Sequence, residues 1–171
     1  MGLNVMVAGI PLIPQTYKDG CWYASLLMMY EWNKKRGGNP TNPADVPTIS
    51  SRYKSQMELP WALVREECGK VGLTDNVILS PSPAKIGEWL QRGPLYVTGV
   101  GTNWRGERVS NGHVFVIGGI REVPTSDEYE IYAYDPDPVN MGHRGWRPIR
   151  HLGIMMEDTN RSEHNTTFLQ Y

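Results

Sequence analysis

The chain has 171 residues, of which 40% are hydrophobic and 20% are charged, with a formal net charge of −1. This composition predicts one globular domain, residues 1–171, that is large enough to bury a core without disulfide bridges or a structural metal. The small net charge gives no reason to expect nucleic acid or an anionic membrane as a partner, and no apolar run is long enough to span a bilayer. Two cysteines, Cys21 and Cys68, are too few for a disulfide framework, although a single bridge between them is conceivable.

Residues 1–14, MGLNVMVAGIPLIP, begin without a basic region and are interrupted by prolines. We therefore do not expect them to act as a signal peptide. The apolar stretch 5–13 predicts an extended segment that leads to Gln15. Beyond it, residues 21–36 predict the central helix of the fold, because apolar side chains occupy nearly every face. Residues 37–47 predict a loop, since they are rich in Gly, Pro and Asn.

The start of the central helix is the most informative position in the sequence. Asp19-Gly20 is a turn and N-cap signal, so Cys21 becomes the first helical residue. Unpaired backbone N–H groups and the positive end of the helix dipole favour a thiolate there, which makes the sulfur a nucleophile near neutral pH. The structural alternative is a buried and inert cysteine, since cysteine is among the most buried residue types.

Two further helices are expected before the chain turns to strands. The first runs from Pro60 to about Lys70 and places Cys68 on its apolar stripe, which predicts a structural role for that cysteine. The second begins after an N-cap, Ser82, and ends at Gly93.

From residue 93 onward the hydrophobic period changes to that of strands. Segments rich in Val, Ile and Tyr predict strands at 93–100, 113–120 and 129–135, with weaker candidates at 151–157 and 166–171. Helices first and strands second predict an α+β fold. We expect a mainly helical lobe at about 1–92, a mainly β lobe at about 93–171 and a cleft between them.

The link between the second and third strands, residues 121–128, is short, so these strands should be antiparallel neighbours. His113 opens one strand and Asp135 closes the other, which brings them together at one end of the sheet. A carboxylate beside an imidazole fixes its tautomer and stabilises its charged form. If that end of the sheet faces Cys21, the three residues form a nucleophile, a base and an orienting carboxylate.

Other side chains compete for parts of this site. Asp137 is an alternative to Asp135, because both belong to the sequence Asp-Pro-Asp-Pro and the prolines make the local geometry hard to predict. Asp135, Asp137 and His143 could be imagined as metal ligands, but they match no known metal-ligand spacing, so we expect neither a metal nor another cofactor. No role is assigned to the histidines in polar, irregular stretches or at the edge of a weak strand, which are His143, His151 and His164.

Four short motifs together carry a family resemblance. Gln15 stands six positions before Cys21, and Ala24-Ser25 follows inside the apolar helix. Gly112-His113-Val114 begins an apolar strand, and Tyr134-Asp135-Pro136 ends another. This set resembles papain-like cysteine peptidases, over about residues 10–140. The Asp-Pro pair and the strings CWYA and GPLYV look like the bacterial branch, which includes bacteriocin-processing peptidases and effector proteases of plant pathogens.

The resemblance implies a papain-like fold, with a central active-site helix packed on a C-terminal antiparallel sheet. It implies Cys21, His113 and Asp135 as a catalytic triad, and an oxyanion hole made by the Gln15 side chain and the backbone N–H of Cys21. The implied reaction is hydrolysis of an amide bond through a thioester acyl-enzyme. Plant papain-type enzymes use Asn at the third position, so this chain departs from them there.

Two other functions fit the same residues. A glutamine deamidase or transglutaminase-like enzyme would use Cys, His and Asp equally well, and a non-catalytic binding module would keep the fold with an inactive site. For the peptidase, the expected substrate is a host or rival protein or the peptide stems of peptidoglycan. Because we expect no signal peptide, we expect export of a toxin or effector by a dedicated secretion system. A cognate inhibitor or immunity protein is a further expected partner.

Overall fold

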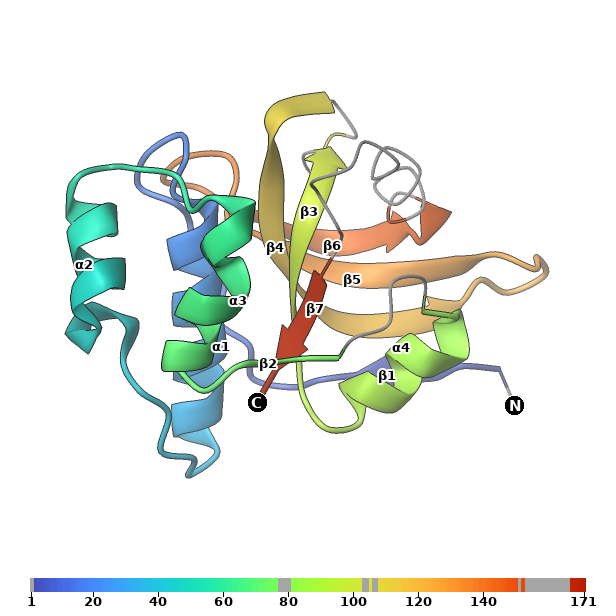
Figure 1. Cartoon of the computed structure of the whole chain (residues 1–171). Coiled ribbons are helices and arrows are strands. Elements are labelled where there is room, and N and C mark those ends of the chain that lie inside the picture. Colours follow the sequence, from blue (N-terminus) through green and yellow to red (C-terminus); the bar gives the residue numbers. More distant parts are fainter. Residues whose placement is uncertain (1, 77–80, 103–104, 106–107, 151, 153–166) are drawn as a thin grey trace.

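The computed structural model describes residues 2–76, 81–102, 105, 108–150, 152 and 167–171 (Figure 1). Its helices are α1 (Cys21–Lys35), α2 (Pro47–Lys54), α3 (Trp61–Lys70), α4 (Pro83–Leu90) and the short 3-10 helix η1 (Pro43–Asp45). Its strands are β1 (Asn4–Met6), β2 (Thr74–Asp75), β3 (Leu95–Thr102), β4 (Arg108–Glu122), β5 (Tyr129–Asp135), β6 (His143–Pro148) and β7 (Thr167–Gln170).

These elements form the α+β architecture that the sequence predicts. The strands make one antiparallel sheet in the order β2-β7-β3-β4-β5-β6, and β1 pairs with β4. Figure 1 shows α1, α2 and α3 together on one side of the sheet, while α4 lies beside β1. The helical lobe therefore meets the sheet along α1, which contacts β3 and β4.

Helix α1 begins at Cys21, as predicted. Its N-cap is Gly20, which offers no side-chain hydrogen bond, and Gly37 ends it in the left-handed region with φ of 82°. The helix is buried on most sides, since Trp22, Met28 and Met29 are at most 2% exposed. A helix with apolar residues around most of its circumference is stable only inside a core, which fixes its position between the other helices and the sheet.

Helices α3 and α4 also lie where the sequence places them. The hydroxyl of Ser82 accepts a hydrogen bond from the backbone N–H of Lys85, which is the N-cap expected at that residue. Cys68 is fully buried in α3. Both cysteines are free thiols, so no bridge links Cys21 to Cys68.

Several elements differ from the sequence prediction. Strand β6 was not expected, and His143 opens it instead of lying in an irregular stretch. Helix α2 was also unexpected; it is anchored by Ile49, which is 1% exposed. The expected strand at 151–157 lies outside the described residues except for Leu152, which is helical, and His151 and His164 lie outside them too.

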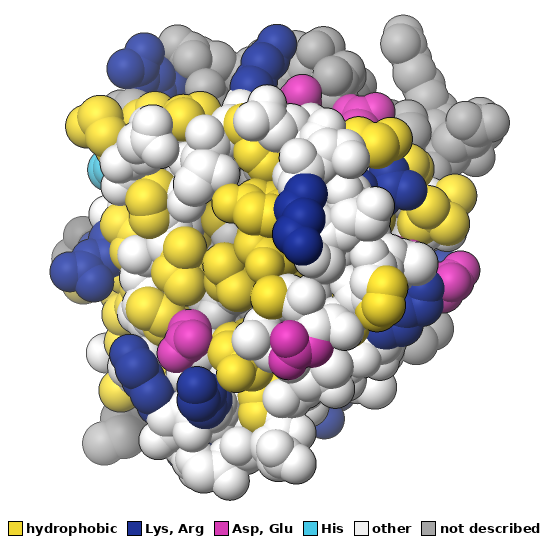
Figure 2. All heavy atoms as spheres, turned by 90° about the vertical axis from the view of Figure 1, so that its left-hand side faces the viewer, with side chains coloured by type: hydrophobic (Ala, Val, Ile, Leu, Met, Phe, Trp, Pro, Cys, Tyr) yellow, Lys and Arg dark blue, Asp and Glu magenta, His cyan; other side chains and the backbone are white. Residues whose placement is uncertain are grey.

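Figure 2 shows the face formed by the helical side of the molecule. Charged side chains of both signs surround a central group of hydrophobic side chains there. None of the helices in the described part of the chain combines the length and the apolar character needed to cross a membrane.

Candidate active site

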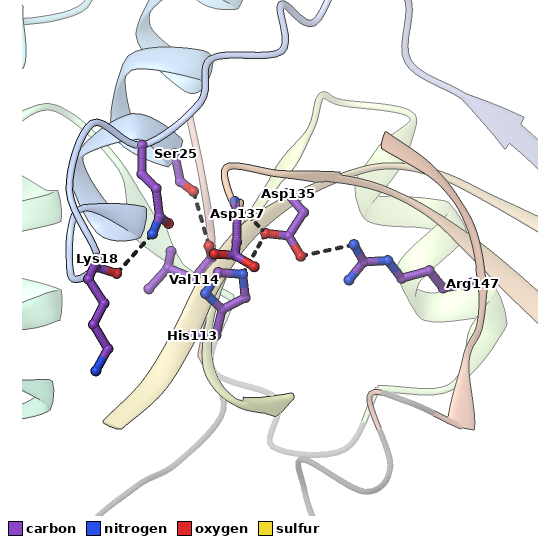
Figure 3. A network of polar contacts seen from close by, with 8 residues as sticks. Lys18, Ser25, His113, Val114, Asp135, Asp137 and Arg147 are labelled. Carbon is purple, nitrogen blue, oxygen red and sulfur yellow. Dashed lines mark hydrogen bonds and ion pairs between the residues drawn. The ribbon is translucent and has the colours of Figure 1, made fainter. Parts of the chain in front are cut away.

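The first turn of α1 presents Cys21 toward the sheet. The thiol is half-buried, in contrast to the fully buried neighbours that follow it in the helix. The hydroxyl of Ser25, one turn further on, donates a hydrogen bond of 3.4 Å to the backbone carbonyl of Val114 on β4. This contact ties the start of α1 to the strand that carries His113 (Figure 3).

Strands β4 and β5 bring His113 and Asp135 together. They pair antiparallel, with Val116 opposite Tyr134, so the beginning of β4 lies beside the end of β5. His113 Nε2 lies 2.5 Å from Asp135 Oδ1, and both side chains are buried. The contact expected from the short link between these strands is therefore present in the structure.

The side chain of Cys21 also acts on the ring of His113 and helps to raise its pKa. Asp135 occupies Nε2, and the Cys21 side chain is a hydrogen-bond partner of the same ring, which leaves Nδ1 for the thiol. Burial alone would favour neutral His113, but the charge of Asp135 and its hydrogen bond, together with Cys21, raise the pKa of His113 to about 10. At neutral pH the ring is therefore a cation held between a carboxylate and a sulfur.

The surroundings of Asp135 keep its carboxylate charged. Burial raises the pKa of this carboxyl, but the charges of His113 and Arg147 and the backbone N–H of Asp137 more than offset it, so the pKa of Asp135 is lowered. The Asp137 N–H donates to Oδ1 at 3.0 Å, and Arg147 Nη2 donates to Oδ2 at 2.9 Å. The carboxylate that contacts His113 is thus that of Asp135, while Asp137 supports it through its backbone.

Arg147 is the site residue that sequence reasoning missed. It comes from β6, a strand that the sequence HRGWRP did not signal, and its side chain is 8% exposed. Such a buried arginine indicates a specific partner, because arginine is almost never fully buried unless it is paired. Nothing in the sequence distinguishes Arg147 from Arg144 and Arg150, which also follow Asp135.

Gln15 lies on the segment that enters α1 and is 3% exposed. Its backbone N–H donates to the carbonyl of Pro136, and its own carbonyl accepts from the N–H of Asn140, so this segment is tied to the loop after β5. The side-chain Nε2 donates to the carbonyl of Lys18 at 2.8 Å, and Oε1 has no hydrogen-bond partner among the described residues. An amide nitrogen has two N–H groups, so one remains for a further acceptor.

The glycine before His113 has a steric role. Gly112 has φ of +72°, and a Cβ added there would lie 2.2 Å from Cζ2 of Trp61. Trp61 begins α3, so its ring reaches from the helical lobe to the start of β4. Any larger residue at position 112 would displace this ring or the backbone next to His113.

Cys68 shows what the same thiol becomes elsewhere in the fold. Burial raises its pKa to about 12, and it lies next to the equally buried Tyr96. It is far too buried to be reached by a substrate, in agreement with the structural role expected for it.

A family model described as papain-like cysteine protease AvrRpt2 matches residues 6–145. The match covers well over half of the 171 residues and includes Cys21, His113 and Asp135. The chain therefore belongs to this family of papain-like cysteine proteases, which is described by AvrRpt2, a bacterial effector. The papain-like fold and the bacterial branch expected from the motifs are confirmed. A comparison with curated proteins gives no significant match.

Proposed function

We propose that the chain is a cysteine peptidase whose nucleophile is Cys21, with His113 as acid and base and Asp135 as the orienting carboxylate. The observation that carries this proposal is the buried chain of contacts from the Cys21 sulfur through His113 to Asp135. An imidazolium next to a sulfur at a helix N-terminus is the environment in which a cysteine acts as a nucleophile. Membership of a protease family supports a protein substrate.

The reaction begins when the sulfur of Cys21 attacks the carbonyl carbon of an amide bond. A carbon–sulfur bond forms and the carbonyl oxygen becomes an oxyanion. The carbon–nitrogen bond then breaks, and the leaving amine takes the proton from Nδ1 of His113, which leaves a thioester. In the second half, His113 removes a proton from water, the hydroxide adds to the thioester, and the carbon–sulfur bond breaks to release the acid.

The oxyanion is stabilised by two donors in this proposal. The backbone N–H of Cys21 has no partner within α1, because it belongs to the first turn of that helix. The second N–H of Gln15 Nε2 is the other donor, and the partly buried hydrogen bond to the carbonyl of Lys18 holds the amide in place. Donors of this kind contribute roughly 3 kcal/mol each in comparable sites.

The test is a cleavage assay on a diverse peptide library, with new termini read by mass spectrometry. Cys21→Ala should abolish cleavage, while Cys68→Ala should keep kcat within about twofold and lose stability only. Release of ammonia from glutamine side chains without new peptide termini would show that the enzyme is a deamidase and not a peptidase. Cleavage that persists at the wild-type rate in Cys21→Ala would overturn the proposal.

We further propose that the protein acts as a secreted effector or toxin against host or rival cells. The family supports this role, since AvrRpt2, the protease that the family description names, is a bacterial effector. Expression of wild type and Cys21→Ala inside plant and bacterial cells tests it. Toxicity that depends on Cys21 in either cell type supports the role, and equal effects of the two chains in both contradict it.

A further inference from the structure

Asp135 has two carboxylate oxygens, and the triad uses only one of them. Oδ1 accepts from His113 Nε2 at 2.5 Å, and Oδ2 accepts from Arg147 Nη2 at 2.9 Å. Figure 3 shows Asp135 between His113 on one side and Arg147 on the other. We propose that Arg147 is a positioning residue for the reaction, which holds Asp135 so that its Oδ1 points at His113; this inference rests on the proposed peptidase site.

The register of β5 and β6 explains how Arg147 reaches Asp135. Ile131 lies opposite Arg147, Ala133 opposite Gly145, and Asp135 opposite His143. Alternate residues of a strand point to the same face, so Asp135 and Arg147 share a face with only the Ala133–Gly145 pair between them. Alanine and glycine have little or no side chain, so the side chain of Arg147 has room to extend along the sheet toward Asp135.

Arg147 is held over the ring of Phe115 on β4. Its guanidinium carbon lies 5.6 Å from the ring centroid, and Phe115 is two residues after His113 in the same strand. A cation over an aromatic face is attracted to it, so the guanidinium is fixed from β4 as well as from β5. The position of Asp135 Oδ2 is thereby tied to the strand that carries the histidine.

The arrangement is a poor way to gain stability. Arg147 is buried, and its Nε has no hydrogen-bond partner among the described residues. A buried ion pair returns little or nothing relative to well-packed apolar side chains of similar volume, because both charges lose their hydration. The cost is explained if the pair serves the chemistry, since an ionised and oriented Asp135 is what keeps His113 charged next to Cys21.

Charge alternates along the site from one element to the next. Cys21 on α1 and Asp135 on β5 are the groups that act on His113. Arg147 on β6 and the backbone N–H of Asp137 contact the carboxylate of Asp135, and His143 on β6 lies opposite Asp135. Loss of Arg147 removes the cation behind Asp135, so the carboxylate becomes more basic and holds the proton of His113 more tightly. The alkaline limb of kcat/KM, which follows loss of that proton, should then move toward higher pH.

The experiment compares Arg147→Met and Arg147→Lys with a matched control, Arg121→Met. Arg121 also pairs with a strand carboxylate, Glu130, and lies over an aromatic ring, that of Trp146, but it is 40% exposed. For Arg147→Met we expect kcat to fall about 10²-fold, because Asp135 is no longer held in place, and the alkaline limb to move up by about one pH unit, with KM nearly unchanged. Arg147→Lys should lie between wild type and Arg147→Met, because a lysine keeps the charge but not the planar fork. Arg121→Met should leave the limb in place.

A second readout does not need activity. The protonation of His113 is followed by NMR of labelled histidine in a Cys21→Ala background, with and without the change at Arg147. The proton should be lost at higher pH in Arg147→Met. A folded Arg147→Met with an unmoved limb and an unmoved His113 titration would overturn the inference; if Arg147→Met does not fold, an unmoved limb in Arg147→Lys does so. If the wild-type protein cleaves no peptide, the proposed function is wrong. The titration of His113 would then still test whether Arg147 acts on the Asp135–His113 pair.

Discussion

The two cysteines occupy opposite kinds of environment within one small fold. Cys21 begins α1, is half-buried and has His113 as a hydrogen-bond partner. Cys68 lies inside α3, is fully buried, and burial raises its pKa to about 12. The residue type is the same, but one sulfur faces a cation at a helix N-terminus and the other faces apolar side chains and a tyrosine.

This difference shows that the groups which distinguish the surroundings of Cys21 from those of Cys68 come from the sheet. Helix α1 provides its N-terminus and position, yet the imidazole, the carboxylate and the arginine come from β4, β5 and β6 in turn. The proposed mechanism therefore also depends on the docking of α1 on β4, to which the hydrogen bond from Ser25 to the carbonyl of Val114 contributes. Each change below breaks or sharpens the contrast between the two cysteines.

Loss of the carboxylate should have the largest effect. In Asp135→Asn the amide no longer stabilises the charged ring, so we expect kcat to fall by about 10²- to 10⁴-fold. Asp137→Asn is the matched control, because it keeps the backbone N–H that donates to Asp135. Steady-state kinetics on a cleaved peptide measure both. An equal loss in the two variants would show that Asp137 also acts through its side chain.

A smaller loss of kcat is expected when Gln15, the proposed oxyanion donor, is replaced. Gln15→Leu removes the side-chain N–H groups and should lower kcat about 10- to 10²-fold, with little change in KM. Gln170→Leu is the control, since Gln170 is also a buried glutamine whose Nε2 donates to backbone carbonyls, of Trp89 and Gly93, but in β7. Both variants should lose stability, measured by thermal unfolding. If kcat falls equally in both, Gln15 acts through the fold alone.

The pH dependence of stability tests the same contrast without a measurement of activity. The folded state raises the pKa of His113 from 6.5 to about 10, so its contribution is complete below 6.5 and is lost as the pH rises through about 10. The contribution of Cys68 is complete below its ordinary value of 9.0 and is lost only toward about 12. Denaturant unfolding should show a decline between 6.5 and 10 in wild type and Cys68→Ala that is weaker in His113→Gln. An identical slope in all three chains would contradict the assignment.

Much of the site was predictable because its residues stand at the ends of elements with strong patterns. A continuous apolar helix after Asp19-Gly20 fixes Cys21, and a short link between two strands rich in Val, Ile and Tyr places His113 beside Asp135. These are local signals, and the resemblance of the motifs to papain-like peptidases added Gln15.

The missing parts depend on contacts distant in sequence. Strand β6 contains Gly and Pro, which disfavour strands, and it forms because β5 offers it an edge to pair with. Helix α2 has a sequence rich in Thr, Ser and Ile, which are weak helix formers, and the burial of Ile49 stabilises it instead. Arg147 could not be foreseen, because its partner is defined only by the register of a strand that the sequence does not reveal.

The most direct test of the central claim is the rate at which each cysteine is alkylated. Iodoacetamide labelling at mild pH, followed residue by residue with mass spectrometry, should modify Cys21 at least about 10²-fold faster than Cys68 in the folded protein. In His113→Ala the reaction of Cys21 should slow by about 10-fold or more, while Cys68 stays unchanged. Labelling of Cys21 at the same rate with and without His113 would contradict a sulfur activated by the imidazole of the sheet.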